Sequence, residues 1–134
     1  MSNNPTRIKQ VFFIDSAVPD SDVIVAGLAT DADYYRLDAT QDGLQQMADS
    51  LAGYSGLDAI QVISHGSPGG LQLGNGLVTQ TSLDDHSVAL SSIGKALSET
   101  GDSLLYGCDV GRAFIQRLAA GTGADVVMWA NSFA

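Results

Sequence analysis

His65 and Cys108 are the two residues whose types and positions favour catalysis. Each follows a short apolar run that is typical of a buried strand, residues 60–63 before the histidine and 103–107 before the chain's single cysteine. Two neighbouring parallel strands would bring them side by side at one edge of a sheet. A partly ionised thiol is a nucleophile, and a nearby imidazole can polarise it and later protonate a leaving amine. This arrangement makes a cysteine–histidine catalytic pair one interpretation of the two motifs.

Two further features would assist such a pair. A glycine, Gly66, follows the histidine and would let a substrate carbonyl approach the backbone closely. The backbone N–H groups of Gly66 and Cys108 are then candidate donors to an oxyanion. A helix predicted over residues 111–120 begins just after the cysteine, and a helix N-terminus favours the thiolate form of a nearby thiol.

Residue types alone also allow a structural interpretation. A lone cysteine at a strand end is usually a small buried hydrophobe, and a lone histidine there is often hydrogen-bonded within the fold. The same two interpretations apply to Asp15 and Asp109, which could orient His65 or contact substrate, or could make turn and capping hydrogen bonds. Both interpretations remain open at this point.

The elements that would position these residues alternate between strands and helices. This alternation predicts an α/β domain with a doubly wound, mostly parallel sheet of about five strands and helices on both faces. Right-handed crossovers favour the strand order 2-1-3-4-5. The expected strands are 11–14, 34–37, 58–64, 103–107 and 126–129. Two helices are expected to begin near residues 20 and 42, and two more to lie within 82–99 and 111–120. A hairpin is expected over 67–79, around Gly74-Asn75-Gly76.

Ligands of such sheets bind beyond the carboxyl ends of the strands. The polar residues expected at that edge include Asp15-Ser16 and Asp38, besides the catalytic pair. The glycine-rich hairpin is expected to act as a flap beside His65 rather than only to cover an edge. The first strand–helix turn lacks a phosphate-binding loop, which argues against a flavodoxin-like domain for a small ligand.

Length and composition set limits on the class of protein. The chain has 134 residues, and we interpret it as a polar lead-in, residues 1–7, followed by one domain, residues 8–134. A net charge of −9 argues against binding to nucleic acid or anionic membranes. No apolar run of this sequence is long enough to span a membrane, and from its first residues we expect no Sec-type signal peptide. We expect no bound metal and no cofactor, and His86, next to Asp84 and Asp85, is interpreted as part of a solvated helix start rather than a metal cluster.

Two strand-end motifs carry a resemblance to a known family. Apolar strand–Ser64-His65-Gly66 and apolar strand–Gly107-Cys108 followed by a helix resemble the caspase, legumain and gingipain clan of cysteine peptidases (clan CD). More closely, the chain is similar to an uncharacterised N-terminal domain of large, repeat-rich, cadherin-like bacterial surface proteins of the same clan. The similarity covers residues 10–127 and rests on segments 11–18, 63–67, 71–74 and 104–110.

The resemblance implies a three-layer caspase-like fold and assigns roles by position. His65 would be the general base and acid, Cys108 the nucleophile, and Gly66 would shape the oxyanion site. Substrate would be held near Asp15, Ser16, Tyr106 and Asp109, together with the region of Asn131, and an acidic Asp15 would favour a basic residue before the scissile bond. The expected reaction is hydrolysis of a peptide bond.

The resemblance also indicates the biological setting. We expect a cysteine endopeptidase that processes a polypeptide, with its own downstream chain as one candidate substrate. It would be secreted or at the cell surface as part of a larger bacterial protein, although a cytoplasmic location is also compatible with the sequence. The closing segment departs from the family's usual continuation, which suggests an excised or truncated domain. The alternative function is a binding or docking domain of an adhesin in which the dyad is silent.

Overall fold

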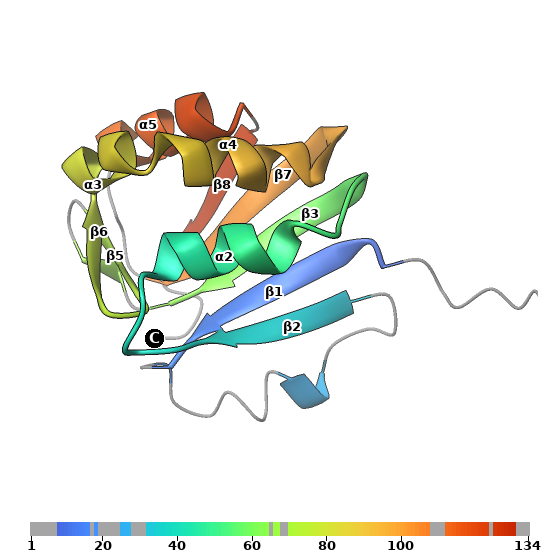
Figure 1. Ribbon diagram of the computed structural model, residues 1–134, viewed down its shortest axis with the longest axis horizontal. Helices are drawn as coiled ribbons and strands as arrows, with labels where there is room; N and C mark the ends of the chain where they lie inside the picture. The colour runs from blue at the N-terminus through green and yellow to red at the C-terminus, as the bar shows by residue number, and fades with distance from the viewer. Residues whose placement is uncertain are drawn as a thin grey trace, which may run out of the picture.

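A five-stranded parallel sheet forms the centre of the computed structural model (Figure 1). Its strands are β1 (Gln10–Asp15), β2 (Ala32–Leu37), β3 (Leu57–Ile63), β7 (Leu97–Gly107) and β8 (Asp125–Ala130). Their order in space is β2-β1-β3-β7-β8, and every neighbouring pair is parallel. Counted within this sheet the order is 2-1-3-4-5, which confirms the prediction. The structure describes residues 8–16, 18, 25–27, 32–64, 66–67, 70–107, 112–123 and 125–130.

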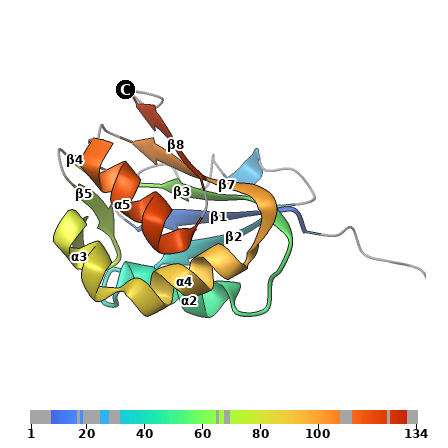
Figure 2. The same cartoon turned by 90° about the horizontal axis from the view of Figure 1, so that it is seen from above.

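Helices lie on both faces of the sheet. Three of them, α2 (Gly43–Leu51), α4 (Ser87–Lys95) and α5 (Arg112–Thr122), form a layer on one face, and α4 packs between the other two (Figures 1 and 2). A helical turn at residues 25–27 lies on the opposite side of β1 and β2. The described residues therefore form the layers expected of a doubly wound α/β domain.

Strands β1 and β3 are buried on both faces, as the apolar run 11–14 and the apolar residues Ile60, Val62 and Ile63 predict. Val11 pairs with Ile60 and Phe13 with Val62, and all four side chains belong to the core beneath the helices. Because side chains alternate along a strand, the intervening residues point to the other face. Two of these, the paired Ile14 and Ile63, are also buried.

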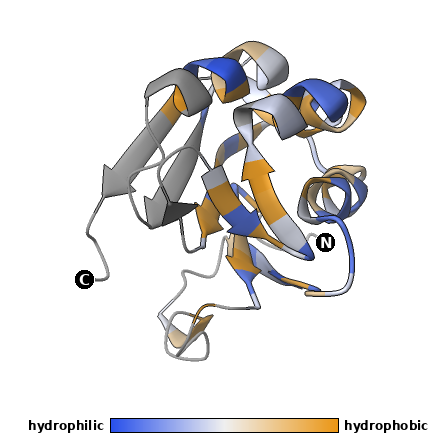
Figure 3. Cartoon of the chain, turned by 90° about the vertical axis from the view of Figure 1, so that its left-hand side faces the viewer, coloured by the Kyte–Doolittle hydropathy of each residue, from blue (hydrophilic) through white to orange (hydrophobic). Residues whose placement is uncertain are grey.

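Helix α2 illustrates how local sequence positions the site. Its residues at the expected i, i+3, i+4 and i+7 spacing are all buried, whereas the intervening ones face solvent. This division between apolar and polar faces recurs along the helices, whose ribbons alternate hydrophobic and hydrophilic segments (Figure 3). Asp42 is the N-cap, and its Oδ1 accepts a hydrogen bond of 3.2 Å from the Gln45 N–H. The buried stripe consists of Leu44, Met47, Ala48 and Leu51.

The predicted hairpin belongs to a small antiparallel sheet that follows β3. This sheet contains β4 (Gly66–Ser67), β5 (Gly70–Leu73) and β6 (Gly76–Thr79) in that order. Leu73 pairs with Gly76, so the turn is formed by Gly74 and Asn75. The hairpin is an integral part of the fold, because the side chains of Leu71, Leu73 and Val78 are buried in the core.

The prediction of a single helix within residues 82–99 is wrong, because two helices lie in this region and the second ends at Lys95. A short helix α3 (Gln80–Asp85) begins after Thr79, whose hydroxyl accepts a hydrogen bond from the Ser82 N–H. The chain then turns at His86 into α4, and β7 already begins at Leu97. Tertiary contacts explain the early strand, since Leu97 pairs with Leu57 and the Leu57 N–H donates to the Ala96 carbonyl at 3.0 Å.

Candidate active site at the carboxyl edge of the sheet

The carboxyl ends of the parallel strands gather the candidate residues at one edge. Strand β1 ends at Asp15, β3 at Ile63 and β7 at Gly107, and these three strands include two adjacent pairs, β1 with β3 and β3 with β7. This edge is where ligands of such sheets bind. The candidate site is therefore built on rigid strands and on the segments that leave them.

The register between β3 and β7 relates the two halves of the predicted dyad. Ile63 is the Cα partner of Tyr106 at the ends of these strands. His65 follows Ile63 by two positions in the sequence, and Cys108 follows Tyr106 by the same number. His65, Cys108 and Asp109 lie outside the residues that the structure describes, so the catalytic roles predicted for them stay predictions.

The residues on either side of His65 are described, and both contact β5. Ser64 is buried, and its hydroxyl donates a hydrogen bond to the Gln72 carbonyl. Gly66 is the first residue of β4 and pairs with Leu71. The predicted oxyanion glycine thus lies in a paired strand directly after the candidate histidine.

Asp15 is a buried contact between β1 and the hairpin. Its side chain is only 1% exposed, and its Oδ1 accepts a hydrogen bond of 2.7 Å from the Gly74 N–H. Ser16, the next residue, is exposed in the turn that closes with a hydrogen bond of 3.0 Å from the Val18 N–H to the Asp15 carbonyl. Ser16 is therefore accessible to a substrate, whereas the Asp15 carboxylate is engaged within the fold.

The tip of the hairpin is also attached to the start of α2. Gly74 forms a β-bridge with Asp42, and the Asn75 N–H donates to the Gln41 carbonyl at 2.8 Å. Asp38, at the end of β2, belongs to the same loop. Hydrogen bonds from the backbone N–H and the hydroxyl of Thr40 hold the pKa of Asp38 below its ordinary value.

His86 lies at the start of α4, as predicted, but its side chain is half-buried and belongs to this hydrogen-bond network. Its Nδ1 lies 2.6 Å from the Ser82 carbonyl oxygen and its Nε2 lies 2.5 Å from Oδ2 of Asp42. A carbonyl oxygen and a carboxylate can only accept, so both contacts are hydrogen bonds when the imidazole carries two protons. The hydrogen bonds to Asp42 and to Ser82 accordingly raise the pKa of His86, although burial lowers it.

The pKa of Asp42 changes in the opposite direction to that of His86. Burial raises the pKa of its carboxyl group, but the hydrogen bonds from His86 and from the Gln45 N–H outweigh burial, so that the net pKa is lowered. The pair joins the N-terminus of α2 to the junction of α3 and α4, two segments that are 44 residues apart. It is a structural contact within the fold.

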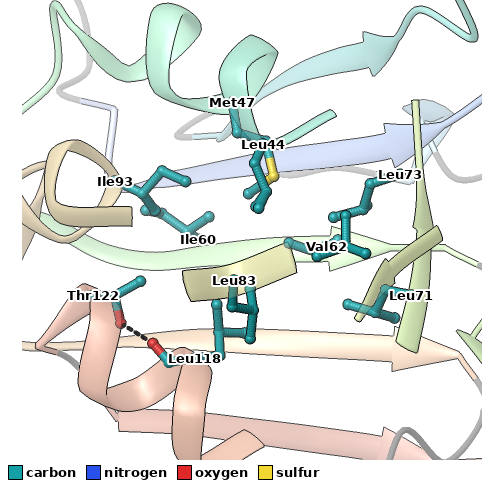
Figure 4. A pocket seen from close by; sticks show the side chains of 11 residues that line it. Leu44, Met47, Ile60, Val62, Leu71, Leu73, Leu83, Ile93, Leu118 and Thr122 are labelled. Atoms are coloured by element: carbon teal, nitrogen blue, oxygen red, sulfur yellow. Dashed lines mark hydrogen bonds between the residues drawn. The ribbon is translucent and has the colours of Figure 1, made fainter. Parts of the chain in front are cut away.

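Two hollows are bordered by residues that the structure describes. An interior space of about 20 Å³ lies between the sheet, the hairpin and the helices (Figure 4). It is a packing gap in the core, because its lining is apolar apart from Thr122, whose hydroxyl donates to the Leu118 carbonyl at 3.0 Å. A second hollow, about 370 Å³, lies between α2 and α4 on the helical layer and is bordered by Asp49, Tyr54 and Lys95.

In the described ranges, no group of three or more histidine, cysteine, aspartate or glutamate side chains is arranged to hold a metal ion. Among the same residues, no helix combines the length and the apolar character needed to cross a membrane.

The fold and the polar carboxyl edge define an α/β domain with a doubly wound, parallel sheet, compatible with a caspase-like fold. The chain belongs to the family described as "Domain of unknown function (DUF4347)", whose sequence pattern matches residues 11–132. No curated protein and no solved structure matches the chain.

The contacts of several residues at this edge could not be predicted from the sequence. Ser64 was noted only as part of a motif, and Gln72, Gly74 and Asp42 received no role in the site. The available signals were a polar residue at the end of an apolar strand and a glycine in a hairpin turn. Their partners lie 8 to 59 residues away, as in Ser64–Gln72 and Asp15–Gly74, and neither helical nor strand periodicity reports such contacts.

Proposed function

We propose that this chain is a caspase-like cysteine endopeptidase domain with His65 and Cys108 as its catalytic dyad. The observation that supports it best is the pairing of Ile63 with Tyr106, because the two candidate residues each follow these partners by two positions. Adjacent parallel strands are about 4.8 Å apart. A pair that continued this register would be close enough for one imidazole to act on the thiol.

The proposed reaction proceeds through an acyl-enzyme. The Cys108 thiolate attacks the carbonyl carbon of the scissile peptide bond, and the N–H groups of Gly66 and Cys108 donate to the developing oxyanion. The imidazolium of His65 gives its proton to the leaving amine as the C–N bond breaks. His65 then takes a proton from water, which hydrolyses the thioester and regenerates the thiol and a carboxylic acid.

The proposed substrate is a polypeptide that binds along the same edge. Ser16, Tyr106 and Asp109 would border the residue before the scissile bond, and the negative charge of Asp15 would favour a basic residue there. Since the Asp15 side chain is buried and bonded to Gly74, it would act through its field and through the hairpin rather than by direct contact. Peptides carrying Arg, Asp or Leu at that position test this preference, which is wrong when Arg has no advantage.

The proposed setting is a large bacterial protein that is secreted or displayed on the cell surface. The domain would process that protein, with the segment downstream of this chain as the candidate substrate. The direct experiment expresses the domain with its native downstream sequence and analyses the products by mass spectrometry. A cleavage that is lost in both Cys108→Ala and His65→Ala, but retained in Thr122→Val, is the expected result.

A docking domain with a silent dyad is the alternative, and thiol chemistry separates the two functions. An activated Cys108 would be alkylated stoichiometrically at mildly acidic pH, and His65→Ala would slow this labelling. A thiol that reacts only after unfolding, together with the absence of any cleavage, would overturn the proposed peptidase in favour of docking.

A further inference from the structure

Ser64 and Gly66, the sequence neighbours of His65, are both bound to strand β5. Before His65, the Ser64 hydroxyl donates to the Gln72 carbonyl, and after it, Gly66 pairs with Leu71. The next pair along the same ladder is Ser67 with Gly70. The two neighbours of His65 are thus both bound to one short stretch of β5.

Strand β5 is itself held firmly. The side chains of Leu71 and Leu73 are buried in the core. In the turn that follows β5, the Gly74 N–H donates a hydrogen bond of 2.7 Å to Oδ1 of Asp15. On the other side, the turn bridges to Asp42 at the start of α2. A residue bound to β5 is therefore positioned relative to both the central sheet and the helical layer.

Ser64 is a polar residue at a position where an apolar one would otherwise be expected. It is 4% exposed and follows the buried run that ends at Ile63. A buried hydroxyl is tolerated when it is hydrogen-bonded, and a strand end of this kind could accommodate Val or Ala without that requirement. The hydroxyl bond therefore fixes residue 64 relative to β5, which an apolar side chain at this position would not do.

We propose that Ser64 is a positioning residue for His65, and that its hydroxyl bond to the Gln72 carbonyl directs the chain as it leaves β3. This inference rests on the proposed function, in which His65 must face Cys108. The Ser64–Gln72 hydrogen bond fixes the residue that immediately precedes His65 in the chain. Small displacements of a catalytic group lower rates strongly, so a single bond next to the histidine is a sensitive point.

The test compares isosteric side chains at position 64. Ser64→Thr retains the hydroxyl, and Ser64→Val has the same shape as threonine without it. Because the chain has only two histidines, the ring signals of His65 and His86 can be followed separately by NMR and assigned with His65→Ala. In Ser64→Val we expect the His65 titration midpoint to move by about half a pH unit, a roughly threefold change in its proton affinity, while Ser64→Thr stays near the original chain.

Two controls separate positioning from general loosening. Thr122→Val removes another hydroxyl that donates to a backbone carbonyl, far along α5, and should leave the His65 signal unchanged. The His86 signal should be the same in all variants. Positioning by Ser64 is overturned if the His65 midpoint and line width are equal in Ser64→Val and Ser64→Thr.

The proposed dyad has its own readout in the same experiment. Cys108→Ala should shift the His65 midpoint, because an ionisable thiol beside the imidazole changes its proton affinity. If the titration midpoint of His65 is the same in Cys108→Ala as in the original chain, the proposed dyad is wrong. The comparison of Ser64→Val with Ser64→Thr still reports whether Ser64 positions the histidine, so the two failures are distinguishable.

Discussion

Asp15 and Gly74, 59 residues apart in the sequence, are joined by a hydrogen bond of 2.7 Å from the glycine N–H to the buried carboxylate. This bond connects the end of β1 to the turn of the β5–β6 hairpin. Since β5 also binds the residues on both sides of His65, the Asp15–Gly74 contact belongs to the frame of the candidate site. The contribution of this hydrogen bond to the free energy of unfolding can be measured whether or not the protein is an enzyme.

Replacing Asp15 should destabilise the fold, and the loss should be larger when the new side chain cannot accept the hydrogen bond from the Gly74 N–H. Asp15→Ala leaves the buried Gly74 N–H without this partner, and an unsatisfied buried donor costs about 1–3 kcal/mol. Asp15→Asn retains a side-chain oxygen that can accept the same bond, so its loss should be smaller. Urea unfolding of the two variants measures the difference, and equal losses would show that the hydrogen bond does not determine the stability at this position.

Gly74 should tolerate no side chain. Its φ is +62°, and a Cβ added there would lie 2.2 Å from the Gln41 carbonyl oxygen. Left-handed backbone alone disfavours alanine by about 1–2 kcal/mol, and the backbone clash adds to it. Gly74→Ala should therefore lower the free energy of unfolding by roughly 2 kcal/mol or more.

The matched control for Gly74 lies in the same hairpin. A Cβ at Gly76 would meet no atom within 4 Å. Gly76→Ala is therefore expected to change stability by no more than about 0.5 kcal/mol, as measured in the same urea titration. Similar losses in the two variants would mean that the turn is not held against α2 as described.

The architecture was accessible from sequence because it depends on local patterns. Apolar runs such as 11–14 marked the buried strands, the stripe from Leu44 to Leu51 marked α2, and right-handed crossovers then limited the strand order. The glycines at 74 and 76 marked the hairpin correctly. These features are repeated along the chain or rest on one or two adjacent residues, so tertiary contacts did not alter them.

The contacts of the site could not be predicted in this way because they join distant segments. His86 was expected at a solvated helix start, yet its partner Asp42 comes from the N-cap of another helix. The early start of β7 likewise depends on Leu57 of a neighbouring strand. At the site itself, His65 and Cys108 lie outside the described residues, and the register of Ile63 with Tyr106 is the contribution of the structure.

The crossing of α4 and α5 should be sensitive to one added methyl group. A Cβ on Gly94 would lie 1.8 Å from the Thr122 carbonyl oxygen. Helix propensity alone would favour alanine over glycine by about 1 kcal/mol, whereas overpacking against backbone costs about 1–3 kcal/mol or more. We expect the clash to dominate and Gly94→Ala to lower the thermal midpoint, while Gly53→Ala, which meets no atom within 4 Å, leaves it nearly unchanged. A more stable Gly94→Ala would show that the two helices separate readily.

The His86–Asp42 pair should make stability depend on pH in a defined direction. The folded state raises the pKa of His86, so its contribution is fully present below the unfolded value of 6.5 and is lost as the pH rises through the raised folded pKa. The folded state lowers the pKa of Asp42, so its contribution is present above 3.8 and is lost as the pH falls through the lowered folded pKa. The pair should therefore stabilise the protein more at about pH 5.5 than at about pH 8.5.

Urea unfolding at these two pH values, compared between the original chain and His86→Gln, measures the effect. Because the Asp42 side chain is 43% exposed, solvent screening should keep the difference below about 1 kcal/mol. Asp42→Asn, which retains a capping side chain for α2, should abolish the same pH dependence. The exposed Asp84–Arg117 pair supplies the control, because it is an ion pair without a histidine, and the effect of Arg117→Gln on stability should be the same at the two pH values. A pH dependence that survives in His86→Gln would assign it to another group.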